Sequence, residues 1–257
     1  LIVHYYNLDL LDKDCHINSM FIKLYKKFCP GPITFILKKK RGSKISNLVT
    51  NNKKTLAVRF PKHKLTRSLL KILDYPLAAP SANISTKISP TSREDVVEDF
   101  GNKLKFVLNG GRSKVGLEST IVSLLNKPEI LRLGGTDIKE INKTLKMKLS
   151  YKKKRNKILA PGQSRIHYSP GIPIRLNVIK PKESDAFILI KRRKIFNKNF
   201  FYLTKNKNLK EAAKNLYKIL RLIKKQKFKT IAVERIPNKS FGQAINDRLK
   251  RASKFKW

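Results

Sequence analysis

The stretch PLAAPSANISTKISPT, residues 76–91, concentrates hydroxyl groups in a chain that is otherwise 30% charged. It contains no carboxylate and begins with a short apolar run, so Ser81 and Asn83 would lie at a strand end, where α/β folds place ligands. The small alanines let a ligand approach the backbone N–H groups, and Ser81, Ser85 and Ser89 add neutral donors. The stretch therefore predicts a phosphate-binding loop. An ordinary Ser/Pro turn is the alternative.

Two further segments carry groups that suit an anionic ligand. The segment KVGLESTIVSLLNKPEILRLGG places Ser119 and Thr120 at the start of one strand and Arg132 near the end of the next. The segment TLAVRFP places Arg59 near the end of an apolar strand, where an isolated buried charge would be costly without an anionic partner. A bidentate clamp on a carboxylate or phosphate is the natural use of such a guanidinium. The alternative for each arginine is a structural ion pair.

The charge of the chain is strongly one-sided. Fifty-nine Lys and Arg against 17 Asp and Glu give a net charge of +42 over 257 residues. A potential of this kind attracts polyanions, so RNA, including tRNA, is a candidate partner. The alternative is compositional drift, because Lys, Asn and Ile are abundant along the whole chain. Charge alone does not decide between them.

The cysteine content and hydropathy narrow the protein class. Cys15 and Cys29 are the only cysteines, too far apart for a CxxC metal site and too few for a disulfide framework. We therefore expect a cytoplasmic protein without a protein-held metal. No apolar run reaches the roughly 18 residues that a membrane span needs, so we expect no membrane association.

The elements that would position these residues follow from periodicity. We expect helices over 18–28, 64–73 and 138–145, and strands over 33–40, 55–60, 105–108, 120–124 and 129–131. Thr91 with Glu94 predicts a capping box for a short helix that runs through Phe100 and stops at Gly101.

A second pattern begins after a basic run at residues 150–157, which is typical of a linker. Strands are expected at 174–179, 186–190, 200–203 and 230–235, with one helix over 209–223 and a closing helix. Strands that alternate with helices indicate an α/β unit with a largely parallel sheet. The predicted domains are 1–150 and 173–257, joined by a linker at 151–172.

The motifs taken together resemble a known family. The segments LIVH, CPGPITFILKKK, TLAVRFP, PLAAPSANISTKISPTSREDV, LNGG, VGLESTIV, EILRLGG and APGQSRIHYSPGIP occur in the order and spacing of the YrdC-like threonylcarbamoyl-adenylate synthases. The part that ends in FGQAINDRLKRAS resembles the second domain of the long form of this family. The resemblance covers the whole chain.

The resemblance implies a fold and an activity. The fold would be an open, twisted mixed α/β sheet around a basic cavity, followed by a smaller Rossmann-like domain. The activity would join L-threonine, bicarbonate and ATP into threonylcarbamoyl-adenylate with release of pyrophosphate. Partner proteins would then transfer the threonylcarbamoyl group to tRNA. Mg²⁺ would be carried on the ATP phosphates, because the sequence offers no carboxylate cluster for it.

The resemblance also assigns roles to residues. On the threonine side it implies His4, Arg59, Ser119 and the backbone of Ala79. The residues implied on the ATP side are Thr55, Ser81, Ser89, Arg132 and, in the linker expected to act as a lid, Arg165. The residues implied in secondary roles are Asn83, Glu118, Thr120 and Tyr168.

The sequence departs from the family pattern at two places, and two other functions remain as alternatives. The chain begins at Leu1, after the place where the family carries further ATP and threonine contacts, so we expect an N-terminally incomplete chain whose activity alone is in doubt. Arg165 stands where a family member can present a tyrosine. The alternative functions are a noncatalytic RNA-binding protein with a YrdC-like cavity and a carbamoyl-adenylate-forming relative of hydrogenase maturation factors.

Overall fold

The computed structural model describes residues 1–151, 167–194 and 197–254. By contacts the chain forms two compact units, each assembled from two separate stretches. The first unit comprises Leu1–Pro80 and Glu118–Gln163, and the second comprises Ser81–Leu117 and Ser164–Trp257. Residues 81–91 of the hydroxyl-rich stretch, called the hydroxyl-rich loop below, therefore belong to the same unit as the C-terminal part of the chain. The predicted contiguous domains, 1–150 and 173–257, remain a prediction.

The first unit is built on a seven-stranded mixed sheet with the strand order β4-β1-β3-β2-β5-β6-β7. The strands are β1 (Ile2–His4), β2 (Ile33–Lys38), β3 (Thr55–Arg59), β4 (Leu77–Ala79), β5 (Thr120–Ser123), β6 (Glu129–Arg132) and β7 (Ser150–Tyr151). The pairs β1–β3, β2–β5 and β6–β7 are parallel, and the other pairs are antiparallel. The predicted mixed α/β sheet is confirmed.

Helices in the first unit, except α4, begin at a residue whose side chain caps the first turn. They are α1 (Leu8–Asp14), α2 (Ser19–Phe28), α3 (Asn47–Thr50), α4 (Lys64–Ile72) and α6 (Ile138–Leu145). In α2 the Asn18 side chain accepts a hydrogen bond from the Phe21 N–H, which satisfies one of the unpaired donors of the first turn. The helix ends before Pro30, which has no N–H to continue it.

The two faces of this sheet have different environments. Side chains alternate along each strand, so Val3, Phe35 and Val58, which are direct partners across β1, β3 and β2, share one face. Phe35 meets Phe21 of α2 edge-on, with 5.0 Å between the ring centroids, so α2 packs on this face. The opposite face carries an apolar cluster that includes Ile36, Ala57 and Ile121.

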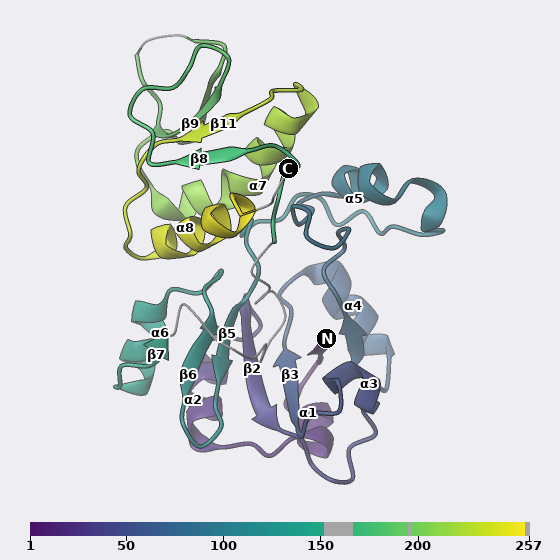
Figure 1. The fold of residues 1–257 in the computed structure, drawn as a ribbon. Helices are drawn as coiled ribbons and strands as arrows, with labels where there is room; N and C mark the ends of the chain where they lie inside the picture. Colours follow the sequence, from purple (N-terminus) through teal and green to yellow (C-terminus); the bar gives the residue numbers. More distant parts are fainter. Residues whose placement is uncertain (152–166, 195–196, 255–257) are drawn as a thin grey trace. The chain divides into compact units, whose positions relative to one another are not determined.

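The second unit contains a four-stranded parallel sheet with the order β10-β9-β11-β8. Its strands are β8 (Ile174–Leu176), β9 (Ala186–Lys191), β10 (Phe200–Thr204) and β11 (Ile231–Val233). Its helices are α5 (Arg93–Phe100), α7 (Leu209–Lys225), α8 (Phe241–Ala252) and the short 3₁₀ helix η1 (Gly101–Lys103). Helices α7 and α8 lie side by side beneath this sheet (Figure 1). The predicted smaller α/β unit is confirmed.

The predicted capping box of α5 is displaced by one residue. The N-cap is Ser92, whose Oγ accepts a hydrogen bond from the Asp95 N–H at 3.4 Å. The Thr91 hydroxyl instead donates to the Asp95 carboxylate at 2.9 Å. Thr91 and Glu94 do not form the box because the Thr91 hydroxyl is already used by that carboxylate.

The predicted strand at residues 105–108 is wrong. These residues form no helix or strand, and the Phe106 side chain is 89% exposed. A strand needs a neighbour that pairs with its backbone, and the structure gives this apolar run no such neighbour among the described residues.

In the part of the chain that the structure describes, no helix combines the length and the apolar character that crossing a membrane requires.

Candidate functional site

A row of polar side chains runs across neighbouring strands of the seven-stranded sheet, at the end where β1 and β3 finish. His4 of β1 lies directly opposite Arg59 of β3, and Arg59 lies directly opposite Thr34 of β2. Strands β1 and β3 are parallel and finish at this end, whereas the antiparallel β2 begins here. On the far side of β2, Ile121 of β5 pairs with both Thr34 and Arg132 of β6. Direct partners share a face, so the register itself gathers these side chains.

Two of the predicted site residues place positive charge close together. Burial, together with the nearby charge of Arg132, lowers the pKa of the Arg59 guanidinium to about 10. Its Nε lies 3.4 Å from the Gly31 carbonyl oxygen, a long hydrogen bond. Among the described residues no Asp or Glu side chain forms a salt bridge with Arg59. Arg132 is buried and Arg59 is half-buried, and like charges in so poorly solvated a place favour an anionic ligand that binds both.

Ser119 connects the two arginine-bearing parts of the row. The Arg132 side chain donates from its Nε to the Ser119 carbonyl oxygen at 3.1 Å and from an Nη to the Ser119 hydroxyl at 3.0 Å. The Ser119 hydroxyl lies 2.7 Å from the Thr34 hydroxyl. Both hydroxyls are fully buried, so these bonds fix the orientation of Arg132.

His4 is held as a neutral imidazole. Burial and the charge of Arg59 lower the His4 pKa to about 4. Its Nδ1 lies 3.3 Å from the Leu77 carbonyl oxygen, and a carbonyl can only accept, so Nδ1 carries the proton. The other ring nitrogen, Nε2, then has a lone pair that can accept a hydrogen bond from a ligand.

Close backbone approach positions the loop before β5. A Cβ on Gly134 would lie 2.3 Å from the Glu118 carbonyl oxygen and 2.5 Å from the Ser119 carbonyl carbon, so only glycine fits there. The same Glu118 carbonyl accepts a hydrogen bond from the Gly135 N–H at 2.8 Å. Thr120 donates to the Thr136 carbonyl at 2.7 Å and accepts from its N–H at 3.0 Å. Thr120 therefore shapes this loop through the backbone.

Thr55 and Ala79 lie farther from the polar row. Thr55 begins β3, four residues before Arg59, which at about 3.3 Å per residue separates them by roughly 13 Å along the strand. Ala79 lies opposite Ile2, two residues from the Leu77 and His4 pair, and its backbone is exposed.

The predicted residues of the hydroxyl-rich loop lie in the second unit. Ser81 is exposed, whereas Ser89 is buried. The Asn83 amide donates to the carbonyls of Ile84 and Lys87 at 2.8 and 3.1 Å, so it braces the loop from within. The structure brings together His4, Arg59, Ser119 and Arg132 in the first unit. The roles of Ser81 and Ser89 stay predictions.

The two predicted residues near the linker have different outcomes. Arg165 lies outside the described residues. Tyr168 is buried in the second unit with a backbone φ of 67°. Its ring stacks on Tyr217 with 5.8 Å between centroids, and the Arg248 guanidinium lies 4.8 Å from its ring centroid.

Thr34 is a candidate that the sequence did not reveal. It lies in an apolar strand and is fully buried, yet its hydroxyl contacts Ser119, and it lies opposite Arg59. The signal would have been a lone hydroxyl in an apolar run. That hydroxyl can be assigned to the site only when the antiparallel register of β2 and β3 is known, and the sequence alone does not give this register.

Neither cysteine is suited to nucleophilic chemistry. Burial raises the pKa of the Cys15 and Cys29 thiols to about 12, so both are protonated at neutral pH. Among the described residues, no group of three or more His, Cys, Asp or Glu could hold a metal ion.

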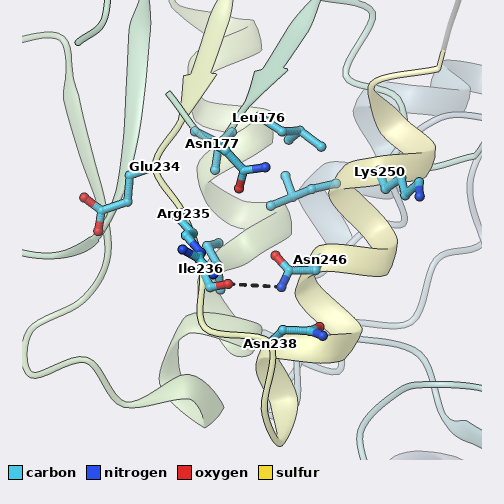
Figure 2. Close-up of a pocket in the computed structure, with 10 residues that line it drawn as sticks. Leu176, Asn177, Glu234, Arg235, Ile236, Asn238, Asn246 and Lys250 are labelled. Atoms are coloured by element: carbon cyan, nitrogen blue, oxygen red, sulfur yellow. Dashed lines mark hydrogen bonds between the residues drawn. The ribbon is translucent and has the colours of Figure 1, made fainter. Parts of the chain in front are cut away.

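A separate pocket of about 240 Å³ lies in the second unit, at the carboxyl ends of β8 and β11 beside α8 (Figure 2). Asn246 donates to the Ile236 carbonyl at 3.1 Å across it, and the Glu234 side chain points away from the other lining residues. None of the predicted site residues lines this pocket.

Two family models match consecutive parts of this chain. Residues 1–134 match the family model described as telomere recombination, and residues 136–254 match the one described as the C-terminal domain of threonylcarbamoyl-AMP synthase. The threonylcarbamoyl-AMP synthase of Pyrococcus abyssi is 32% identical over 100% of this chain and 80% of its own length. That of Schizosaccharomyces pombe is 33% identical over 94% of this chain and 68% of its own.

Solved structures agree with the sequence comparison. The crystal structure of P. abyssi Sua5 complexed with L-threonine covers 98% of this chain and 79% of its own, with a TM-score of 0.86 and 32% identity. The fold and the family matches together place the chain among two-part α/β proteins of the nucleotidyltransferase class. The chain belongs to the family of two-domain threonylcarbamoyl-AMP synthases. The first of the three predicted functions is thereby confirmed.

Proposed function

We propose that this chain condenses L-threonine, bicarbonate and ATP into threonylcarbamoyl-AMP, with release of pyrophosphate, and that partner proteins pass the product to tRNA. The observation that carries the proposal is the convergence of the buried Arg132, the half-buried Arg59, a neutral histidine and a fixed serine hydroxyl at one end of neighbouring strands. Family membership and the P. abyssi structure, which is complexed with L-threonine, support it.

The threonine end of the site is assigned to the polar row. Arg59 clamps the amino-acid carboxylate, because a poorly solvated guanidinium with no acidic partner among the described residues suits a bidentate anion. His4 accepts a hydrogen bond through Nε2 from the threonine amine or hydroxyl, since its Nδ1 proton is directed to Leu77. Ser119 and the backbone of Ala79 complete this end.

The ATP end is assigned to Arg132, Thr55, Ser81 and Ser89. Arg132 offsets the negative charge that develops as pyrophosphate departs, and the hydroxyls donate to phosphate oxygens. Mg²⁺ would be held by ATP oxygens and water, since the described residues offer it no cluster of carboxylates. Arg165 remains a prediction for the same end.

The reaction needs no nucleophile from the protein. The threonine amine attacks the carbon of carbon dioxide and loses a proton, or attacks that of bicarbonate with loss of water. The resulting carbamate oxygen then attacks the α-phosphorus of ATP. The bond from the α-phosphorus to the bridging oxygen breaks, and pyrophosphate leaves with its electron pair. The residues supply positioning and charge neutralisation, which are large terms in phosphoryl and nucleotidyl transfer. The protonated thiols fit this scheme.

Threonine-dependent pyrophosphate release tests the proposal. The complete protein is incubated with ATP, bicarbonate and L-threonine, and pyrophosphate and threonylcarbamoyl-AMP are measured. Release should require all three substrates and fall to background when threonine or bicarbonate is omitted. Pyrophosphate release that ignores threonine, or no release at all, would contradict the proposal.

A further inference from the structure

Helix α7 carries a buried arginine that binds two carboxylates of α5. The Arg221 guanidinium donates to both oxygens of Asp99, at 3.2 and 2.6 Å, and its Nε lies 3.7 Å from the Asp95 carboxylate. Arg221 is only 6% exposed. A buried guanidinium in a two-point bond with a carboxylate has one preferred geometry, so α5 is fixed on α7.

The same arginine reaches the end of the hydroxyl-rich loop. Its Nη2 donates to the Ile88 carbonyl at 2.9 Å. Asp95, next to Arg221, accepts from both the Thr91 N–H and the Thr91 hydroxyl, at 2.7 and 2.9 Å. Arg221 therefore holds Ile88 directly and Thr91 through Asp95, and Ser89 lies between these two residues.

The stretch 81–117 also contacts α7 near its C-terminal end, at Gly116. A Cβ on Gly116 would lie 2.4 Å from the Lys214 Cα, so the backbone of Gly116 is in direct contact with the helix. Lys214, Arg221 and Lys225 are spaced by seven and four residues and share one helical face. Lys225 pairs with Glu98 at 2.9 Å, but both are well exposed, so this pair contributes little.

We propose that Arg221 is a positioning residue for the ATP end of the site: it fixes Ile88 and Thr91 so that the intervening Ser89 presents its hydroxyl to the nucleotide. The inference rests on the proposed function, in which Ser89 contacts ATP. It gives the C-terminal part of the chain an indirect role in substrate binding, because the loop is held by a helix that lies more than 100 residues later in the chain.

Arg221→Lys in the complete protein tests the inference. Lysine keeps the charge but cannot bond both oxygens of Asp99 and the Ile88 carbonyl at once. The KM for ATP should rise about 10-fold, whereas the KM for threonine should stay within about twofold. The matched control is Lys225→Met, which removes the exposed pair on the same helical face and should leave both KM values unchanged.

A second variant separates this inference from the function on which it rests. Ser89→Ala should raise the KM for ATP; if it does not, Ser89 has no nucleotide role and both proposals about Ser89 fail. If Ser89→Ala raises the KM for ATP but Arg221→Lys leaves it unchanged, Arg221 has no positioning role while the proposed function stands. Equal rises in both KM values for Arg221→Lys would indicate a merely structural role and would also overturn the inference.

Stability is measured in parallel. If Arg221→Lys does not fold, Asp99→Asn takes its place, because it keeps Arg221 and its bond to Ile88 while removing one carboxylate charge. The expected change is then a smaller, about threefold rise in the KM for ATP alone. An unchanged KM for ATP in a folded Asp99→Asn protein would count against the inference.

Discussion

Arg59 and Arg132 differ in what restrains them. Arg132 is oriented by two hydrogen bonds to Ser119, whereas Arg59 has one long hydrogen bond to the Gly31 carbonyl. A guanidinium with few restraints from the protein can adjust to a ligand. This difference supports the assignment of the carboxylate clamp to Arg59.

Replacing Arg59 by alanine should affect threonine binding selectively. The loss of the charge-assisted hydrogen bonds to the carboxylate should cost about 1.5–3 kcal/mol, which raises the KM for threonine roughly 10- to 100-fold. The KM for ATP should change far less. Steady-state kinetics with each substrate varied in turn measure both values. Arg41→Ala, at an exposed position in the same unit, is the control, and equal effects on the two substrates would contradict the assignment.

His4 should make the stability of the protein depend on pH. Its pKa is about 4 in the fold and 6.5 as a free side chain, so between these values the unfolded chain binds more protons. The contribution of neutral His4 to the free energy of unfolding is fully present above pH 6.5. It is lost as the pH falls towards 4, and the loss amounts to at most about 3 kcal/mol. Urea denaturation at pH 7 and pH 4.5 should show a smaller difference for His4→Gln than for the natural chain.

The control for this measurement is His16→Gln, at an exposed position. It should retain the full pH dependence of the natural chain. If His4→Gln and the natural chain lost the same stability between pH 7 and pH 4.5, His4 would not be the neutral buried group described above.

At the scale of elements, local patterns were predictable and pairing was not. The helices at 19–28, 138–145 and 209–225 follow from apolar spacing, because their core contacts repeat every three or four residues. The run at 105–108 has strand composition but forms none, since a strand depends on a distant neighbour. The polar row was predicted only residue by residue. Thr34 was missed because its place beside Arg59 depends on register.

Because Gly134 is in close contact with backbone atoms of the loop before β5, we expect that no larger residue fits there. Gly134→Ala places a methyl group against backbone atoms that have no free space, which should cost about 1–3 kcal/mol in unfolding free energy. Displacing Ser119 should also reduce pyrophosphate release. Gly42→Ala is the matched control because a Cβ there would meet nothing within 4 Å. Similar stabilities for the two variants would show that the loop adapts.

At the scale of the whole molecule, the division of the chain by sequence families differs from its division into compact units. The family models divide the chain near residue 135, whereas contacts group Ser81–Leu117 with the C-terminal part. Sequence motifs revealed the family because they are read along the chain. They could not reveal this grouping, because it depends on the carboxylates of α5 meeting Arg221 of α7 across more than 100 residues.

Deleting residues 164–257 should therefore destabilise a segment far upstream. Asp95 and Asp99 would lose Arg221, and α5 would lose the helix α7 to which these bonds attach it. Hydrogen exchange should show loss of protection in α5. The amides of β3 serve as the internal control, because their partners β1 and β2 remain. Full protection of α5 in the shortened chain would contradict this expectation.

The approach of Arg59 to Arg132 also bears on how selection acts on this sequence. Two like charges in a poorly solvated place repel each other until an anion arrives, so this corner of the fold is frustrated in the free protein. A neutral side chain at either position would relax it and make the free protein more robust. The two arginines therefore lower the stability of the free protein in exchange for anion binding, a compromise between stability and activity that is common in proteins.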